Sequence, residues 1–278
     1  MDVRWVELER DGARLWAADH GGEGPPVLLL HGLLGHAREW DSTAAWLTRT
    51  HRVVALEQRG HGRSERTPAD VSPAAFTADA ARWIEQLGIA PAVVVGQSLG
   101  GLTALRLAAE RPDLVCALVV CEATPAADAG SGGAVRSWLA DWPVPFATEA
   151  AARTFFGGDT LVARAWTAGL ERRDDGLHPA FDAGVVLAAL AGANDRDWWG
   201  EWQRVTCPTL IVRAIDGAPE AEVERMRALR PEAQLAEIED SGHDVHLDQP
   251  GRWQAALEPF LAGVEPGRAR TNRFRPDS

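Results

Sequence analysis

The distribution of apolar and polar residues predicts strands at eight places along the chain. Residues 3–8 and 13–18 have the composition of two strands, and the Asp11-Gly12 pair between them is a typical hairpin turn. Fully apolar or nearly apolar runs follow at 27–30, 52–56, 92–95, 114–120, 209–213 and 234–238. Short continuous apolar runs are typical of strands that are buried on both faces of a parallel sheet.

Segments with helical periodicity lie between most of these strands. One apolar helix face is formed by Phe76, Ala80, Trp83, Ile84 and Leu87, and a second by Leu102, Leu105, Leu107 and Ala108. Strands that alternate with helices predict an α/β fold, in which helices cover both faces of a mostly parallel central sheet.

The alternation stops between about residue 123 and residue 202. This stretch begins with the small-residue segment AADAGSGGA and continues with helical patterns but no convincing strand. Half of the 12 tryptophans lie in it: Trp138, Trp142, Trp166, Trp198, Trp199 and Trp202. We interpret the stretch as a helical cap inserted over the carboxyl edge of the sheet.

The chain therefore divides into a core, an insertion and a tail. Residues 1–123 and 203–264 form the α/β core, and residues 124–202 form the helical cap. Residues 265–278 lack apolar periodicity and are expected to be a loosely ordered tail.

Composition and charge exclude several classes of function. The formal net charge is −12 and the pI is about 5.1, which disfavours nucleic acid as a partner. No apolar run approaches the roughly 20 residues needed to span a bilayer, and the first residues do not resemble a signal peptide, so a cytoplasmic protein with no membrane partner is expected. The three cysteines form no CxxC pair and are expected to be free thiols. The sequence does not determine the oligomeric state.

A serine lies in a sharp turn directly after the buried run 92–95. In Gly96-Gln97-Ser98-Leu99-Gly100 the two glycines leave room for a close backbone approach between a strand and the helix that follows. This context is typical of a nucleophile elbow, which exposes the serine hydroxyl. A serine hydroxyl needs a base to remove its proton, so Ser98 is a candidate nucleophile that requires partners.

A second turn could supply hydrogen-bond donors for the oxyanion that forms when the serine attacks. His31-Gly32 follows the apolar run 27–30 and opens a loop near the strand ends. The backbone N–H groups of Leu33 and Leu99 are the candidate donors. The His31 imidazole is expected to have a structural role.

Two histidines near the C-terminus are candidates for the base. His243 follows a strand and Ser241-Gly242, which places it on a loop at the edge of the sheet where the serine lies. His246 is expected to begin the next helix, and we therefore assign the base to His243.

The acid that orients this histidine has two candidates. Asp216 comes just after the run 209–213, and the chain order Ser, Asp, His is the one expected for this architecture. Glu122 also directly follows a buried strand and could reach the same histidine from the neighbouring strand. We favour Asp216 and keep Glu122 as the alternative acid.

Five motifs together resemble the α/β-hydrolase superfamily: HGLLG, EQRGHGRS, GQSLGG, the strand-ending Asp216 and SGHDVHLDQP. The resemblance covers about residues 4–262. It implies an eight-stranded sheet whose second strand is antiparallel, with a cap inserted after the sixth strand. It also implies the roles given above for Ser98, His243 and Asp216, with Leu33 and Leu99 as oxyanion donors.

The resemblance limits the reaction as well. Arg59 and His61 lie in what looks like the family's structural turn and are expected to be scaffold. The family often has Asp where Glu57 stands, and usually has Gly where Ala214 stands. Because the nucleophile is serine, the carboxylate-ester mechanism of epoxide hydrolases and haloalkane dehalogenases is excluded.

The expected activity is hydrolysis of a small or medium, largely apolar ester, lactone or thioester through an acyl-enzyme. No metal or organic cofactor is expected, because no metal-ligand spacing or phosphate-binding loop is present. The cap should select this small-molecule substrate, with Trp138 and Trp142 as the candidate pocket residues. Two alternatives stay open: the same triad could hydrolyse C–C bonds or perform cofactor-free perhydrolase chemistry, or the chain could be a non-catalytic binding protein on this fold.

Overall fold

The central sheet has the eight strands expected from the sequence. The computed structural model describes residues 3–128 and 130–264, and the expected tail at 265–278 lies outside this range. The eight strands of the sheet are β1 (Arg4–Arg10), β2 (Ala13–Gly21), β3 (Pro26–Leu30), β4 (Arg52–Glu57), β5 (Ala92–Gln97), β6 (Val115–Cys121), β9 (Thr209–Ala214) and β10 (Gln234–Ile238). They pair in the order β1-β2-β4-β3-β5-β6-β9-β10. β2 is antiparallel to both of its neighbours and the pairs from β4 to β10 are parallel, which confirms the expected α/β-hydrolase sheet.

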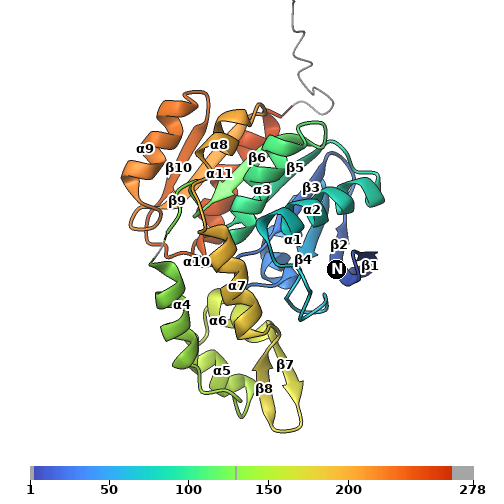
Figure 1. Cartoon of the computed structure of the whole chain (residues 1–278), viewed down its shortest axis with the longest axis vertical. Coiled ribbons are helices and arrows are strands. Elements are labelled where there is room, and N and C mark those ends of the chain that lie inside the picture. The colour runs from blue at the N-terminus through green and yellow to red at the C-terminus, as the bar shows by residue number, and fades with distance from the viewer. Residues whose placement is uncertain (1–2, 129, 265–278) are drawn as a thin grey trace, which may run out of the picture.

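Helices cover both faces of this sheet (Figure 1). The helical elements of the core are η1 (Ala37–Trp40), α1 (Asp41–Leu47), α2 (Pro73–Leu87), α3 (Leu99–Glu110), α8 (Trp199–Arg204), α9 (Glu220–Leu229), α10 (Val245–Asp248) and α11 (Pro250–Ala262). Buried side chains of α2, α3, α8 and α9 form one apolar cluster with one face of the sheet. Those of α1 and α11 form a second cluster on the opposite face. β5 and β6 are buried along their whole length, which explains why their sequences are continuous apolar runs.

The chain between β6 and α8 forms an insertion that lies beyond the carboxyl ends of the parallel strands (Figure 1). Its elements are α4 (Ser131–Ala140), α5 (Glu149–Phe155), α6 (Leu161–Ala168), β7 (Leu170–Arg173), β8 (Gly176–Pro179) and α7 (Ala183–Ala193). None of the described helices is long and apolar enough to cross a bilayer.

Two details of the insertion differ from the expectation. β7 and β8 pair as a short antiparallel hairpin, although no strand was expected there. Their sequences LERR and GLHP do not alternate apolar with polar residues, so periodicity could not identify them. In addition, Trp199 and Trp202 of α8 are buried in the core cluster under α3, so the chain re-enters the core before the expected boundary at 202.

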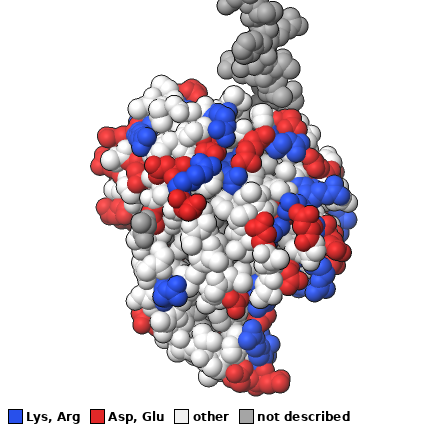
Figure 2. All heavy atoms as spheres, viewed as in Figure 1, with Lys and Arg blue, Asp and Glu red and all other residues white. Residues whose placement is uncertain are grey.

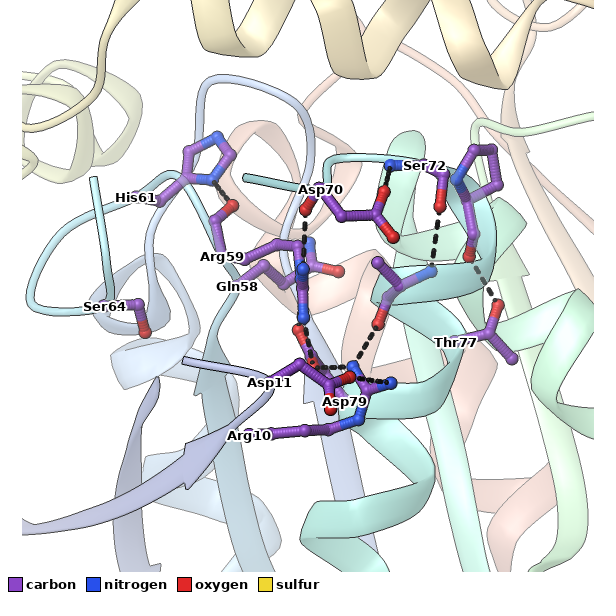
Figure 3. A network of polar contacts seen from close by, with 12 residues as sticks. Arg10, Asp11, Gln58, Arg59, His61, Ser64, Asp70, Ser72, Thr77 and Asp79 are labelled. Atoms are coloured by element: carbon purple, nitrogen blue, oxygen red, sulfur yellow. Dashed lines mark hydrogen bonds and ion pairs between the residues drawn. The ribbon is translucent and has the colours of Figure 1, made fainter. Parts of the chain in front are cut away.

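A buried ion-pair network fixes the turn after β4 to helix α2 (Figure 3). The Arg59 guanidinium donates to both carboxylate oxygens of Asp79, over 2.6 and 2.7 Å, and Arg10 donates to the same carboxylate over 2.8 Å. Arg59 also donates to the backbone carbonyl of Asp70. Charges this deeply buried are tolerated because each has a partner, and the network supports the scaffold role expected for Arg59.

Candidate active site

Ser98 occupies a strained turn between β5 and α3. Its backbone has φ +52° and ψ −119°, a conformation that residues with a side chain rarely adopt. An added Cβ at Gly96 would lie 2.1 Å from the Gly100 carbonyl oxygen, and one at Gly100 would lie 2.3 Å from the Leu30 carbonyl oxygen. The two glycines are therefore required by the close backbone packing that holds this turn.

The loop after β3 lies beside this turn. Leu33 and Leu99 both line the cavity into which Ser98 opens. Leu99 is the first residue of α3, and N–H groups in the first turn of a helix have no partner within the helix. An added Cβ at Gly32 would lie 2.2 Å from Oε1 of Gln97, so the loop packs directly against the nucleophile turn.

His31 and His61 connect this loop to the turn after β4 through contacts with backbone groups. The His31 Nε2 accepts a hydrogen bond from the Gln58 backbone N–H over 3.0 Å, and its Nδ1 donates to the Gly32 carbonyl over 2.7 Å. The His61 ring nitrogens lie against the carbonyls of Leu33 and Arg59. Burial lowers the pKa of both histidines, and their contacts with backbone groups agree with structural roles.

His243 lies on the loop between β10 and α10 and faces the same cavity. The side-chain amide of Gln97 donates to the His243 backbone carbonyl over 2.9 Å, which ties this loop to the residue preceding Ser98. The His243 side chain is 59% exposed and lines the cavity together with Ser98. The structure thus brings the serine and the histidine selected from the sequence to one site.

The carboxylate beside this histidine belongs to Glu122 and not to Asp216. The Glu122 Oε2 lies 3.3 Å from the His243 Nδ1, and the Glu122 side chain is 2% exposed. Asp216 is exposed, and the described contacts include no hydrogen bond between it and His243. The structure therefore corrects the expected position: the alternative candidate, Glu122, and not the favoured Asp216, lies beside His243.

The backbone around Glu122 forms a specific binding site for its carboxylate. Oε1 accepts hydrogen bonds from the N–H groups of Ala214 at 2.7 Å and Ala218 at 3.4 Å. An added Cβ at Gly217 would lie 2.4 Å from both carboxylate oxygens. Glu122 itself has φ +50° at the end of β6. The loop after β9 thus surrounds a carboxylate that comes from the neighbouring strand, whereas Asp216 is exposed on the cavity wall.

Opposing effects set the pKa of His243. Partial desolvation inside the cavity lowers it, but the hydrogen bond to Glu122 and the carboxylates of Asp244, Glu122 and Glu39 together raise it more, so the pKa lies above the ordinary value. In its deprotonated form, the His243 ring can accept a proton from a hydroxyl group.

His246 has a structural position. Its ring is fully buried and stacks on Trp40 with a centroid distance of 4.1 Å. Burial lowers the pKa of His246 to about 4. Its Nε2 lies 3.5 Å from the Glu39 carboxylate, and burial raises the pKa of Glu39 to about 7. The ring is packed in the core, away from the cavity.

A cavity of about 1230 Å³ extends from Ser98 into the insertion. Trp138 lines it as expected, but Trp142 does not, since that indole is buried behind the cavity wall among Trp138, Phe146 and Phe156. Four further aromatic residues line the cavity that the sequence did not single out as pocket residues: Phe155, Phe156, Trp166 and Trp198. Aromatic periodicity alone does not distinguish the cavity side of a short helix from its packed side.

The ionisable residues of the cavity wall are acidic or histidine. Its carboxylates are Glu39, Glu122, Asp128, Asp216, Glu222 and Asp244. In the part of the chain that the structure describes, no arginine lines the cavity, and the chain contains no lysine. Among the described residues, no group of three or more His, Cys, Asp or Glu side chains is placed to hold a metal ion.

Comparisons with known proteins agree with this architecture. A model of the alpha/beta hydrolase family matches residues 27–257. The esterase Rv0045c of Mycobacterium tuberculosis is 39% identical over 277 residues, which cover 93% of this chain and 88% of the relative. The sn-1-specific diacylglycerol lipase ABHD11 of Mus musculus is 31% identical over 252 residues, which cover 86% of this chain and 81% of the relative. The crystal structure of E-2-(acetamidomethylene)succinate hydrolase superposes with a TM-score of 0.86 at 23% identity, covering 94% of this chain and all of that one, which shows a shared fold.

Proposed function

This chain belongs to the alpha/beta hydrolase family, and we propose that it is a serine hydrolase that cleaves an uncharged, largely apolar ester, lactone or thioester. The observation that carries the proposal is the strained Ser98 turn opening into the same cavity as His243, which is hydrogen-bonded to the buried Glu122. The two named relatives, an esterase and a lipase, agree with this reaction class.

In the proposed mechanism, neutral His243 accepts the proton of the Ser98 hydroxyl through Nε2 as Oγ attacks the substrate carbonyl. Glu122 accepts the hydrogen bond from Nδ1–H and stabilises the imidazolium that forms. The N–H groups of Leu33 and Leu99 donate to the oxyanion. The imidazolium then protonates the departing alcohol or thiol, and an acyl-enzyme remains on the serine.

Water completes the cycle. His243 takes a proton from the water that attacks the acyl carbonyl, and returns it to the Ser98 oxygen as the acid departs. In this scheme the insertion acts as a cap that holds the substrate beneath its aromatic side chains.

The charge of the cavity supports an uncharged substrate. An anionic group would enter a site lined by six acidic residues, with no described arginine to pair with it. Like charges brought together in a desolvated cavity cost several kcal/mol. The aromatic residues of the insertion provide an apolar surface for an acyl or alcohol group.

A fluorophosphonate probe tests the nucleophile. The wild-type protein should gain one covalent label by intact mass, and Ser98→Ala and His243→Ala should gain none. Ser241→Ala, which removes a nearby serine that does not line the cavity, should label like the wild type. A folded wild type that neither labels nor hydrolyses small esters would contradict the proposed function and favour a binding protein.

A matched pair of esters tests the charge preference. We expect kcat/KM for p-nitrophenyl butyrate to exceed that for p-nitrophenyl hemisuccinate by at least about tenfold, because the second acyl group carries a carboxylate into the acidic cavity. Equal or faster hydrolysis of the hemisuccinate would contradict an uncharged substrate and leave the serine mechanism intact.

A further inference from the structure

Helix α6 of the insertion binds the loop that carries His243 and the loop that carries Leu33. The Trp166 indole N–H donates a hydrogen bond to Oδ2 of Asp244, the residue directly after His243, over 2.9 Å. On the preceding residue, the Ala165 carbonyl accepts a hydrogen bond from Nε2 of His36 over 2.9 Å. Adjacent residues of one helix thus contact both loops that contribute to the site.

The Trp166 ring also forms part of the cavity wall. It stacks on Phe156 with a centroid distance of 5.8 Å and meets Trp138 edge-on at 5.2 Å. One side chain therefore contacts the space proposed for the acyl or alcohol group and, through its N–H, the neighbour of the proposed base.

We propose that Trp166 is a positioning residue for His243, acting through the hydrogen bond between its indole N–H and Asp244. This inference rests on the proposed function. The hydrogen bond holds the loop of residues 242–244 in the conformation in which Nδ1 of His243 meets Glu122. A substrate group packed against the Trp166 ring holds α6 in place and so favours the aligned histidine.

The surroundings of Asp244 make its hydrogen-bond partner important. Burial raises the pKa of Asp244, whereas His246, the Trp166 N–H and His243 favour its charged form. The other carboxylates that act on this region are Glu39 and Glu122. Without the indole donor, the half-buried Asp244 carboxylate would lose a hydrogen bond and turn toward another donor or water.

A second contact limits the expected effect. The Gln97 side chain still holds the His243 backbone carbonyl when the indole donor is removed. We therefore expect partial misalignment of the histidine and a loss of rate that is well below the loss from removing the base itself.

The first experiment compares Trp166→Phe with Trp142→Phe. Both keep an aromatic ring in the same cluster, but only Trp166 uses its N–H to bind a loop of the site. The Trp142 N–H has no hydrogen-bond partner in the described part of the chain, and its ring does not line the cavity. We expect kcat on p-nitrophenyl acetate to fall about tenfold in Trp166→Phe with KM within twofold, and to stay within about twofold in Trp142→Phe.

Variants of Asp244 separate positioning from charge. Asp244→Asn keeps an oxygen that can accept the indole hydrogen bond, so kcat at high pH should stay within about threefold of the wild type. In Asp244→Asn, the fall of kcat at acidic pH should occur at lower pH than in the wild type. The reason is that one carboxylate that raises the pKa of His243 is removed while Glu122 and Glu39 remain. Asp244→Ala should match Trp166→Phe, and the double variant should be no slower than either single one, because both remove the same interaction.

The outcomes are distinguishable from failure of the proposed function. If the wild type does not label with fluorophosphonate or hydrolyse esters, the function itself fails. If the wild type is active and folded Trp166→Phe keeps its kcat, or loses no more than Trp142→Phe, the positioning role is wrong. Additive losses in the double variant would overturn it as well.

Discussion

The edge of the core sheet and the insertion contribute to the same cavity, but they are built in different ways. At the sheet edge, the chain is packed too closely to accept a side chain at Gly96, Gly100 or Gly217. An added Cβ at each of these positions would lie within 2.4 Å of another atom. The insertion instead lines the cavity with aromatic side chains that pack mostly edge to face. On the face shown in Figure 2, charged side chains are dense over the core and sparse over the insertion.

This difference suggests separate tasks for the two regions: the sheet edge positions the proposed catalytic groups, and the insertion selects the substrate. A nucleophile, a base and an acid need fixed relative positions, and backbone contacts provide them at little conformational cost. Aromatic side chains of the insertion that, unlike Trp166, form no hydrogen bond with a loop of the site can be exchanged without disturbing those positions. We therefore expect changes at the sheet edge to affect kcat, and changes in the insertion, apart from Trp166, to affect KM and substrate choice.

The largest expected effect comes from the acid. Glu122→Gln should lower kcat about 10³-fold, because the amide cannot stabilise the imidazolium and can favour the wrong tautomer of His243. Asp216→Asn should stay within about threefold. Steady-state kinetics on p-nitrophenyl acetate measures both. The reverse ranking would restore Asp216 as the acid.

A smaller but distinct effect is expected at Gly217. In Gly217→Ala the methyl group would displace the Glu122 carboxylate, and kcat should fall about 10- to 100-fold with little change in KM. Gly251→Ala is the control, since nothing lies within 4 Å of its added Cβ. Thermal unfolding of both variants checks that the fold is retained. An unchanged kcat in Gly217→Ala would show that the Glu122 site is not tightly enclosed.

The pH profile gives a graded test of the same site. The base must be neutral, so kcat/KM should fall as the pH drops through a His243 pKa above the ordinary value of 6.5, and reach about a tenth of its maximum one pH unit below that midpoint. Glu122→Gln should move the midpoint to lower pH, because it removes a group that raises this pKa. Asp216→Asn should not move it. A wild-type midpoint below 6.5 would contradict the arrangement of carboxylates around His243.

The smallest expected effect tests the insertion. Trp138→Ala removes an aromatic wall of the cavity, and KM for p-nitrophenyl hexanoate should rise about fivefold while that for the acetate stays unchanged. Because KM does not depend on the concentration of active enzyme, a general loss of active protein cannot produce this change. A comparable fall in kcat on both esters would mean that Trp138 supports the chemistry and is not only a wall of the cavity.

The sequence by itself determined the sheet and most of the site at its edge. Continuous apolar runs identify the buried strands, because side chains covered on both faces must all be apolar. Ser98 could be found because it directly follows such a strand, and His243 because it lies on the loop after the last strand, β10; the carboxyl ends of parallel strands meet at one edge.

Only the tertiary structure shows which carboxylate lies beside His243 and which aromatic residues line the cavity. Both Glu122 and Asp216 follow strands in the sequence. Only the fold shows that the Glu122 carboxylate accepts hydrogen bonds from the Ala214 and Ala218 N–H groups and occupies the space that a side chain at Gly217 would fill. Trp138 and Trp142 look equivalent in sequence, but they lie on opposite sides of the wall. These choices depend on contacts between residues far apart in the chain, and local periodicity contains no information about them.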